Sequence, residues 1–333
     1  MFQRLNGTAH GTRLANDSHG WGTKVGSYLL ILGIATGSAT TATSQTYTTI
    51  DYPQANQTTA VGISGGNIVG YYQNSGGTGG GFLYNGASFT SIDDPLTTTR
   101  TLALGISGSN IVGAYTDSAN ISQGFLYDGS SYTTLADPLG ANGTTAYGIS
   151  GSNIVGSYGD AANSLHGFLY NGSSYVTLDD PLGVKGTQLY GISGNNIVGS
   201  YYDAANNGHS FLYNGSTFST LNDPLGVGTL AVGISGNDIV GTYFDAGGHI
   251  HGFLYNGVSY TTLDDPLGNG GSAVLGISGN TVVGYYISVT GSPPLVQSTS
   301  HGFMATPVPE PSTAVLALVG AVAFLVRRRQ TGP

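Results

Sequence analysis

The chain has 333 residues, contains no cysteine, and carries a net charge of −9 at pH 7 although only 8% of its residues are charged. Without cysteine it has no disulfide bonds, and its negative charge is repelled by nucleic-acid phosphates. The composition therefore argues against a disulfide-stabilised scaffold and against a nucleic-acid partner.

The first 44 residues are predicted to form a signal peptide with a long leader. Tyr28 to Ala35 make a short apolar segment, Lys24 precedes it, and small residues occupy 37–42. This order of a basic, an apolar and a small-residue region is typical of a secretory signal. We expect cleavage between Ala39 and Ser44 and an exported body that covers residues 45–307.

The predicted body is far more acidic than the whole chain. Its only basic residues are Arg100 and Lys185, against 15 aspartates and no glutamate. A net charge near −13 favours solubility outside the cell, or affinity for divalent cations, over binding to polyanions.

The body consists of six copies of one unit. The string Gly-Ile-Ser recurs at a spacing of 42 or 43 residues, and a Gly-Phe-Leu-Tyr string or a variant of it follows each copy. The six copies begin at Gly62, Gly105, Gly148, Gly191, Gly233 and Gly276. Self-similarity at this period indicates a solenoid or a propeller. Short apolar segments bounded by turn residues make helical repeats poor candidates.

Each unit of about 43 residues is predicted to form four strands, here called A, B, C and D. In the second unit these are Leu102–Ser107, Ile111–Tyr115, Gly124–Tyr127 and Tyr132–Leu135. Asp128-Gly129 between strands C and D suits a type I′ hairpin turn. Apolar residues on both faces of strands B and C indicate sheets that are covered on both sides.

The two ends of the body complement each other. The sixth unit stops after its strand C, at Ala305, whereas Tyr47–Ile50 supplies an extra strand D before the first unit. Closing the last sheet with the N-terminal strand would remove exposed edges. We therefore predict an all-β, six-bladed β-propeller whose last blade is closed by Tyr47–Ile50. A β-solenoid with capped ends is the alternative.

This topology would gather most of the acidic residues on one face. The A–B and C–D turns lie on one side of such a ring, and the B–C and D–A connections lie on the other side with 13 of the 15 aspartates. The candidate ligand or cation face comprises Asp94, Asp117, Asp137, Asp160, Asp180, Asp203, Asp223, Asp245 and Asp265.

Two roles remain open for these aspartates. Neighbouring carboxylates supply ligands that suit Ca²⁺, and nearby Tyr and Asn side chains suit glycans. Alternatively, Asp before Pro caps a turn and keeps the surface soluble. No EF-hand or nonapeptide calcium pattern is present, so the sequence names no metal.

Histidine is the other candidate for chemistry. His166, His209, His251 and His301 each stand at the start of a strand C, and His249 precedes His251 by two residues. Equivalent positions on different blades point away from one another, so we predict a structural role. The irregular stretch 287–300 contains no ionisable residue, which argues against catalysis there.

The chain ends in a three-part pattern. Val308, Pro309, Glu310 and Pro311 precede an apolar segment at 312–326, and Arg327, Arg328 and Arg329 follow it. As a helix the segment rises roughly 22 Å, short of the roughly 30 Å of a bilayer core. The pattern resembles the PEP-CTERM sorting signal of Gram-negative bacteria. This resemblance implies export, transient anchoring in the inner membrane and release by an exosortase-type enzyme. A permanent single-pass tail anchor is the alternative.

The Gly-Ile-Ser and His-Gly-Phe strings resemble the HAF-type extracellular repeat over Tyr47 to Ala305, with Gly or Ser in place of the middle Ala. The resemblance implies an exported repeat protein of bacteria that make exopolysaccharide or biofilm matrix, and it supplies no catalytic residues or cofactor. We expect a non-catalytic surface or matrix protein that binds glycan or protein through its acidic face. The alternative is a propeller enzyme, a polysaccharide lyase or hydrolase, which should concentrate unusual polar residues in one or two blades near the axis.

Overall fold

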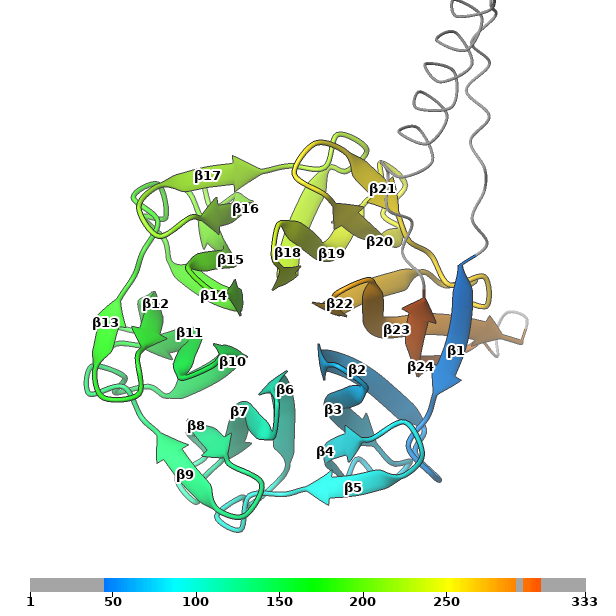
Figure 1. Cartoon of the computed structure of the whole chain (residues 1–333), viewed down its shortest axis with the longest axis horizontal. Coiled ribbons are helices and arrows are strands. Elements are labelled where there is room, and N and C mark those ends of the chain that lie inside the picture. The colour runs from blue at the N-terminus through cyan, green and yellow to red at the C-terminus, as the bar shows by residue number, and fades with distance from the viewer. Residues whose placement is uncertain (1–44, 292–295, 307–333) are drawn as a thin grey trace, which may run out of the picture. The chain divides into compact units, whose positions relative to one another are not determined.

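A computed structural model describes residues 45–291 and 296–306. In these residues, 24 strands form six antiparallel sheets of four strands, and the sheets stand as blades around a common axis (Figure 1). The predicted six-bladed β-propeller is confirmed, and the solenoid alternative is wrong. The predicted leader and sorting tail lie outside the described residues, so the domain boundaries stay predictions. No helix within the described ranges is long and apolar enough to cross a membrane.

The strands follow the predicted A, B, C and D order. Blades 1 to 3 consist of β2 (Gln57–Ser64), β3 (Asn67–Gln73), β4 (Gly79–Tyr84) and β5 (Phe89–Ile92); β6 (Thr101–Ser107), β7 (Asn110–Thr116), β8 (Ser122–Tyr127) and β9 (Tyr132–Leu135); and β10 (Thr144–Ser150), β11 (Asn153–Gly159), β12 (Leu165–Tyr170) and β13 (Tyr175–Thr177). Blades 4 to 6 consist of β14 (Thr187–Ser193), β15 (Asn196–Tyr202), β16 (Gly208–Tyr213) and β17 (Phe218–Leu221); β18 (Gly228–Ser235), β19 (Asp238–Phe244), β20 (Ile250–Tyr255) and β21 (Tyr260–Thr262); and β22 (Ser272–Ser278), β23 (Thr281–Thr290), β24 (Gln297–Thr306) and β1 (Thr46–Ile50).

The ring closes as the two ends predicted. Strand β1 pairs with β24, with Tyr47 opposite Ala305 and Ile50 opposite Gly302. The N-terminal strand is therefore the outer strand of the sixth blade (Figure 1). This pairing covers the edge that β24 would otherwise expose.

The predicted type I′ turns between strands C and D are wrong. Only the glycine of each pair has a positive φ, as in Gly129 at 98°, whereas a type I′ turn needs positive φ at two successive residues. The loop spans four residues and is closed by a bond from the Asp128 N–H to the Ser131 carbonyl. The Asp128 carboxylate also accepts the N–H groups of Ser130 and Ser131, and this side-chain cap favours the longer loop.

The hydrophobic core lies between blades. In one such cluster Val112 and Leu135 of the second blade pack on Ala146, Ile154 and Phe168 of the third. The equivalent phenylalanine of every strand C is fully buried; these residues are Phe82, Phe125, Phe168, Phe211, Phe253 and Phe303. Each contributes about 2–3 kcal/mol by leaving water. Every blade therefore depends on its neighbours.

A belt of hydrogen bonds explains the recurring Gly-Ile-Ser string. The serine hydroxyl of each blade accepts the N–H of a turn glycine in the next blade, for example Ser107 Oγ from Gly151 N at 3.3 Å. The belt closes from the last blade to the first, where Ser278 Oγ accepts the Gly65 N–H at 3.2 Å. The first residue of the string leaves little room for a side chain, because a Cβ at Gly62 would lie 3.0 Å from the Leu104 carbonyl oxygen of the next blade. The string thus joins adjacent blades.

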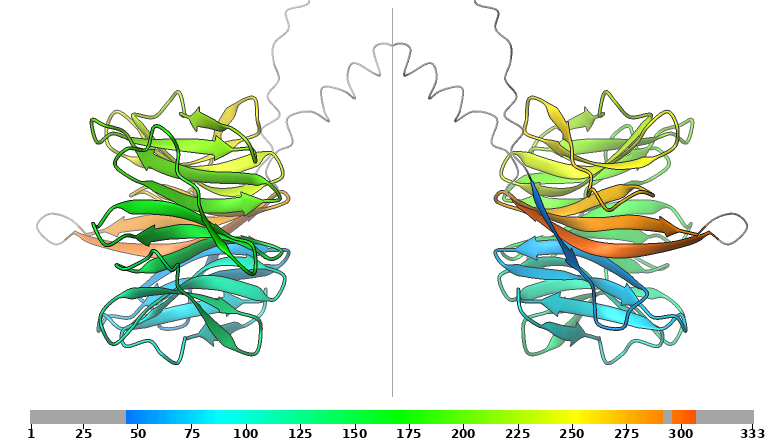
Figure 2. Two further views of the ribbon diagram at one scale, coloured as in Figure 1. Left: turned by 90° about the vertical axis from the view of Figure 1, so that its left-hand side faces the viewer. Right: turned by 90° about the vertical axis from the view of Figure 1, so that its right-hand side faces the viewer.

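We call the side of the ring that holds the B–C and D–A connections the loop face, and the opposite side the turn face. The hairpin of β23 and β24 is longer than its equivalents, because its ladder continues to Thr290 opposite Gln297. Figure 2 shows this hairpin reaching past the other blades. Within the stretch that is irregular in the sequence, residues 287–290 and 297–300 therefore extend the two strands.

Candidate functional site: the loop face and the first-blade groove

Five aspartates of the predicted ligand face are buried. Each directly precedes a proline in a D–A connection, and each is between 2% and 5% exposed: Asp94, Asp137, Asp180, Asp223 and Asp265. Asp137 is typical: its Oδ1 accepts the Leu139 N–H at 2.9 Å, and its own N–H donates to Thr144 Oγ1 at 3.0 Å. The structure therefore places these five carboxylates inside turns, in the capping role, and not on an exposed binding face.

Burial also shifts the pKa of two of these carboxyls. Loss of solvent raises the pKa of Asp180 and of Asp265. Asp265 Oδ2 is buried with no hydrogen-bond partner among the described residues. A carboxyl in this setting is a poor ligand for a cation that approaches from solvent.

The other four predicted aspartates organise the B–C loops: Asp117, Asp160, Asp203 and Asp245. In each loop Oδ1 accepts the backbone N–H groups two and four residues later, as Asp245 does from Gly247 and His249, both at 2.8 Å. These bonds stabilise the carboxylate, so they lower the pKa of Asp245 and bring that of Asp203 to about 2. One oxygen of each carboxylate is thus used by the loop itself.

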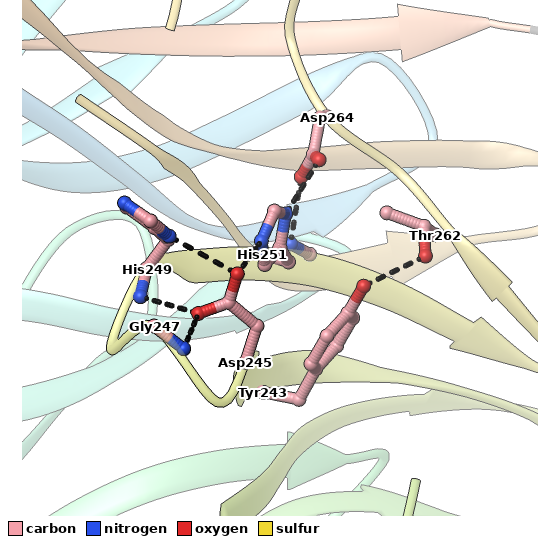
Figure 3. A network of polar contacts seen from close by, with 8 residues as sticks. Tyr243, Asp245, Gly247, His249, His251, Thr262 and Asp264 are labelled. Atoms are coloured by element: carbon pink, nitrogen blue, oxygen red, sulfur yellow. Dashed lines mark hydrogen bonds and ion pairs between the residues drawn. The ribbon is translucent and has the colours of Figure 1, made fainter. Parts of the chain in front are cut away.

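In three of the four loops the second carboxylate oxygen lies near a histidine, as Figure 3 shows for the fifth blade. His251 lies between two carboxylates, with Nδ1 at 2.7 Å from Asp264 Oδ2 and Nε2 at 3.6 Å from Asp245 Oδ2. Its ring stacks on Tyr243, whose hydroxyl lies 2.9 Å from Thr262 Oγ1. Burial opposes the charged imidazole, but the bonds to the two aspartates raise the pKa of His251 overall.

Related contacts recur around the ring with variations. His166 lies between Asp179 and Asp160, whereas the equivalent Gln123 in the second blade donates to Asp117 Oδ2 at 3.0 Å. His301 reaches Asp51 of the N-terminal segment at 2.8 Å. These contacts agree with the structural role predicted for the histidines. Within the ranges that the structure covers, no group of three or more His, Cys, Asp or Glu side chains is arranged to hold a metal ion.

The first blade departs from this pattern at two positions, the residue before proline and the residue that is histidine at the start of most C strands. Tyr52 stands before Pro53 where the five other connections have Asp, and Gly80 stands where most blades have His. The Tyr52 N–H still donates to Thr58 Oγ1 at 3.0 Å, so the turn itself is kept. The ring of Tyr52 stacks on Tyr72, with centroids 3.7 Å apart and planes 4° from parallel.

An open groove lies beside these two tyrosines, and we call it the first-blade groove. It has a volume of about 710 Å³, and its lining residues are Tyr52, Pro53, Gln54, Tyr72, Asn74, Ala87, Ser88 and Phe89. The groove combines three aromatic rings with two amides and a hydroxyl. Burial and the hydrogen bond to Tyr52 raise the pKa of Tyr72 to about 12, so its phenol stays neutral.

Backbone strain marks the same place. Gln54 has a φ of 65°, a conformation that residues other than glycine rarely adopt. Of the four non-glycine residues with positive φ among the described residues, the other three are asparagines that occupy equivalent places in three B–C loops. Gln54 has no such repeat. The sequence carried the signal for this site, a Tyr-Pro pair among Asp-Pro pairs, but sequence reasoning missed it.

Comparison with known proteins identifies the C-terminal signal. Residues 307–330 match the PEP-CTERM protein-sorting motif, which includes the predicted Val308–Pro311 and Arg327–Arg329 signal. The motif implies an exported, membrane-anchored precursor of a Gram-negative bacterium and a substrate of exosortase-type processing. No curated protein matches this chain.

Several solved structures are similar to this chain at low identity. A fucose-recognising six-bladed lectin of Aleuria aurantia is 14% identical with a TM-score of 0.46, over 80% of this chain and 99% of the lectin. AofleA from Arthrobotrys oligospora is 12% identical with a TM-score of 0.45, over 77% and 86%. A Trypanosoma rangeli sialidase is 10% identical with a TM-score of 0.45, over 82% and 58%. Likenesses this weak carry no argument about function.

Proposed function

We propose that this protein is an exported, non-catalytic binding protein of the bacterial cell surface or exopolysaccharide matrix, and that it binds glycan in the first-blade groove. The observation that carries the proposal is the loss of the repeat pattern at one junction. A structural need recurs around the ring, as the buried aspartate does in five connections and the Asp–His contact does in four blades. The stacked Tyr52 and Tyr72 occur at only one junction.

The chemistry of the groove suits a sugar ring. Flat aromatic faces pack against the apolar face of a pyranose, and a few amide and hydroxyl groups bind its hydroxyls. Tyr52, Tyr72 and Phe89 supply the faces, whereas Gln54, Asn74 and Ser88 supply the polar groups. A binding site of this composition fixes both the position and the orientation of a small saccharide.

Electrostatics favour a neutral glycan. None of the eight lining residues is charged, and the body around them has a net charge near −13. This surface would repel an acidic polysaccharide, and the repulsion would extend over about 8–10 Å at physiological ionic strength. We expect neutral hexose or deoxyhexose chains to bind.

The same lining supports a role without catalysis. Hydrolysis of a glycosidic bond normally uses two carboxyl groups on either side of it. The first-blade groove contains no Asp, Glu or His, and the nearest repeated carboxylates serve turns and loops. The proposal therefore takes the binding alternative in preference to a lyase or hydrolase.

A glycan array on the full-length chain tests the proposal, with Tyr52→Asp as the decisive variant. This change restores the residue that the other five connections use, so the turn keeps its bond to Thr58 and the fold is retained. We expect the wild type to bind neutral glycans and Tyr52→Asp to lose at least tenfold in affinity. Leu139→Ala, on the equivalent connection of the second blade, should bind as the wild type does.

A calcium chelator gives a second arm. The groove offers no carboxylate, so binding should be the same with and without Ca²⁺. Equal glycan binding by Tyr52→Asp and wild type would overturn the first-blade groove as the site. Binding that requires Ca²⁺ would return the argument to the aspartates of the loop face.

A further inference from the structure

A β-bulge interrupts the strand nearest the axis in all six blades. The innermost strand of each blade carries a β-bulge at the residue before the Gly-Ile-Ser glycine, for example between Ala146 and Gly148. A bulge re-aims a side chain. These strands stand nearest the axis of the ring (Figure 1), and their six bulge residues line one cavity. We call the six bulge residues the axial collar: Val61, Leu104, Tyr147, Tyr190, Val232 and Leu275.

An axial cavity adjoins the collar. It has a volume of about 170 Å³ and is lined by the six collar residues together with Tyr71. Tyr71 pairs with Thr59, which precedes Val61 in β2, so the cavity lies on the loop-face side of the collar. On the other side, the collar residues and the glycine and isoleucine of each Gly-Ile-Ser string line a smaller cavity of about 80 Å³.

The lining of the axial cavity is asymmetric. Four collar positions are aliphatic, but adjacent blades 3 and 4 carry Tyr147 and Tyr190, whose rings meet edge to face with centroids 5.2 Å apart. The two large collar side chains are matched by small residues on strand B: these two blades have Ser157 and Ser200 where the first blade has Tyr71. Blades 3 and 4 therefore form a sector with two phenols, which we call the phenolic sector; Tyr71 of the first blade supplies a third phenol, and the other four lining residues are aliphatic.

The phenols are fixed and neutral. The Tyr190 hydroxyl donates to Gln188 Oε1 at 3.0 Å and lies 3.3 Å from Ser200 Oγ. Burial raises the pKa of Tyr190 to about 12 and raises that of Tyr147. Both phenols thus keep their protons at physiological pH and present oriented dipoles beside an apolar wall.

We infer that the axial cavity is a second binding site, for a small neutral molecule with a single ring and one hydrogen-bonding group, of the size of a substituted phenol. A cavity of about 150 Å³ with an apolar lining holds a benzene ring. An anion or cation would lose its hydration without gaining an opposite charge, because no lining residue is charged. The phenolic sector gives the ligand one polar partner.

The test uses the full-length chain and 4-methylphenol, measured by isothermal titration calorimetry, with benzoate as the charged analogue of similar shape. We expect saturable binding of 4-methylphenol at one site per chain and no binding of benzoate. Leu104→Phe and Val232→Phe fill the cavity from different blades, and each should weaken binding at least tenfold. Leu96→Phe adds the same ring on an exposed loop and should change nothing.

Tyr190→Phe separates the polar contribution from the shape. This variant should bind 4-methylphenol three- to tenfold more weakly and toluene as tightly as the wild type does. Thermal unfolding of each variant verifies its fold, and if one filling variant does not fold, the other decides. Absence of saturable binding, or unchanged binding in a folded filling variant, would overturn the inference. Tyr52→Asp should leave this binding intact, so the axial cavity and the first-blade groove are tested separately.

Discussion

Aspartate takes three roles on the loop face, and the partners of the carboxylate decide which. Before proline it is buried and closes a turn, as Asp137 does. In the B–C loops it accepts two backbone N–H groups, as Asp160 does from Ala162 and Ser164. At the end of strand D it faces the histidine at the start of strand C, as Asp179 faces His166 at 2.7 Å.

The capping role predicts a cost for removing one buried carboxylate. Asp137→Ala leaves the Leu139 N–H without its acceptor, which should lower the free energy of unfolding by about 1–3 kcal/mol. Urea unfolding of the full chain measures it. Leu139→Ala in the same turn removes an exposed side chain and should stay within about 0.5 kcal/mol of the wild type. Equal stabilities of the two variants would contradict the capping role.

The Asp–His pairs predict a pH dependence with a defined sign. The pKa of His166 is raised by the bond to Asp179, and that of His251 is raised overall, so the folded state binds these protons more tightly than the unfolded state. Their stabilisation is complete below about pH 6.5, the unfolded pKa, and is lost as pH rises through the raised values. The melting temperature should therefore drift downward over this range.

A double variant, His166→Gln with His251→Gln, supplies the control for this drift. Glutamine already occupies the equivalent position in the second blade, where Gln123 binds Asp117. The double variant should fold and show a flatter melting temperature between pH 6 and 8.5. At the acid end both proteins should lose stability alike as pH falls from 3.8 toward about 2, through the lowered pKa of Asp203. A double variant that keeps the wild-type drift would assign it to other groups.

Among the elements, the hairpin of strands A and B packs most tightly, because its two backbones and the phenylalanine of strand C lie close together. Glycine in strand B lets the backbone of strand A and the buried phenylalanine of strand C meet. A Cβ on Gly70 would lie 2.0 Å from the Thr59 carbonyl oxygen and 2.8 Å from Phe82 Cζ. The hairpin cannot open to accept it without moving a strand that packs against the neighbouring blade.

A pair of alanine substitutions in this hairpin tests the requirement. Gly70→Ala should cost more than about 3 kcal/mol or prevent folding, because it overpacks a closed core. Gly66→Ala, four residues earlier in the turn, meets no atom within 4 Å and should stay within about 0.5 kcal/mol. Chemical denaturation of both proteins provides the comparison. A stable Gly70→Ala protein would mean that the blades yield more than this packing allows.

For the whole molecule, closure by β1 joins residues that are more than 250 positions apart. The pairing of Thr48 with Met304 and of Ile50 with Gly302 ties the two ends of the ring together. Ile50 is buried in the cluster that joins the sixth blade to the first. Stability of the ring should therefore respond strongly to a covalent link at this seam.

An engineered disulfide at the seam tests this expectation in a chain with no cysteine of its own. Thr48→Cys with Met304→Cys places two cysteines opposite each other on paired strands, at a separation that a disulfide can span. Oxidation should raise the free energy of unfolding by up to about 5 kcal/mol, because the loop that it closes is long. The reduced double variant is the control. If oxidation leaves unfolding unchanged, the seam does not limit stability.

The sequence by itself determined the architecture of this protein. The Gly-Ile-Ser period counted the blades, the unpaired Tyr47–Ile50 segment closed the ring, and the strand order placed the acidic connections on one face. The PEP-CTERM motif was readable in the same way. These features rest on local patterns of apolar and turn residues, which fix strands and their order before any distant contact is known.

Only the tertiary structure decided what the individual side chains do. The aspartates before proline are buried, His166 meets Asp179 from 13 residues away, and Tyr52 stacks on Tyr72 beside a groove. The turn between strands C and D differs from its predicted type because the Asp128 side chain caps a longer loop. The physical reason is that burial and side-chain partners depend on how blades pack across the ring, and alternation along one strand carries no information about its neighbours in space.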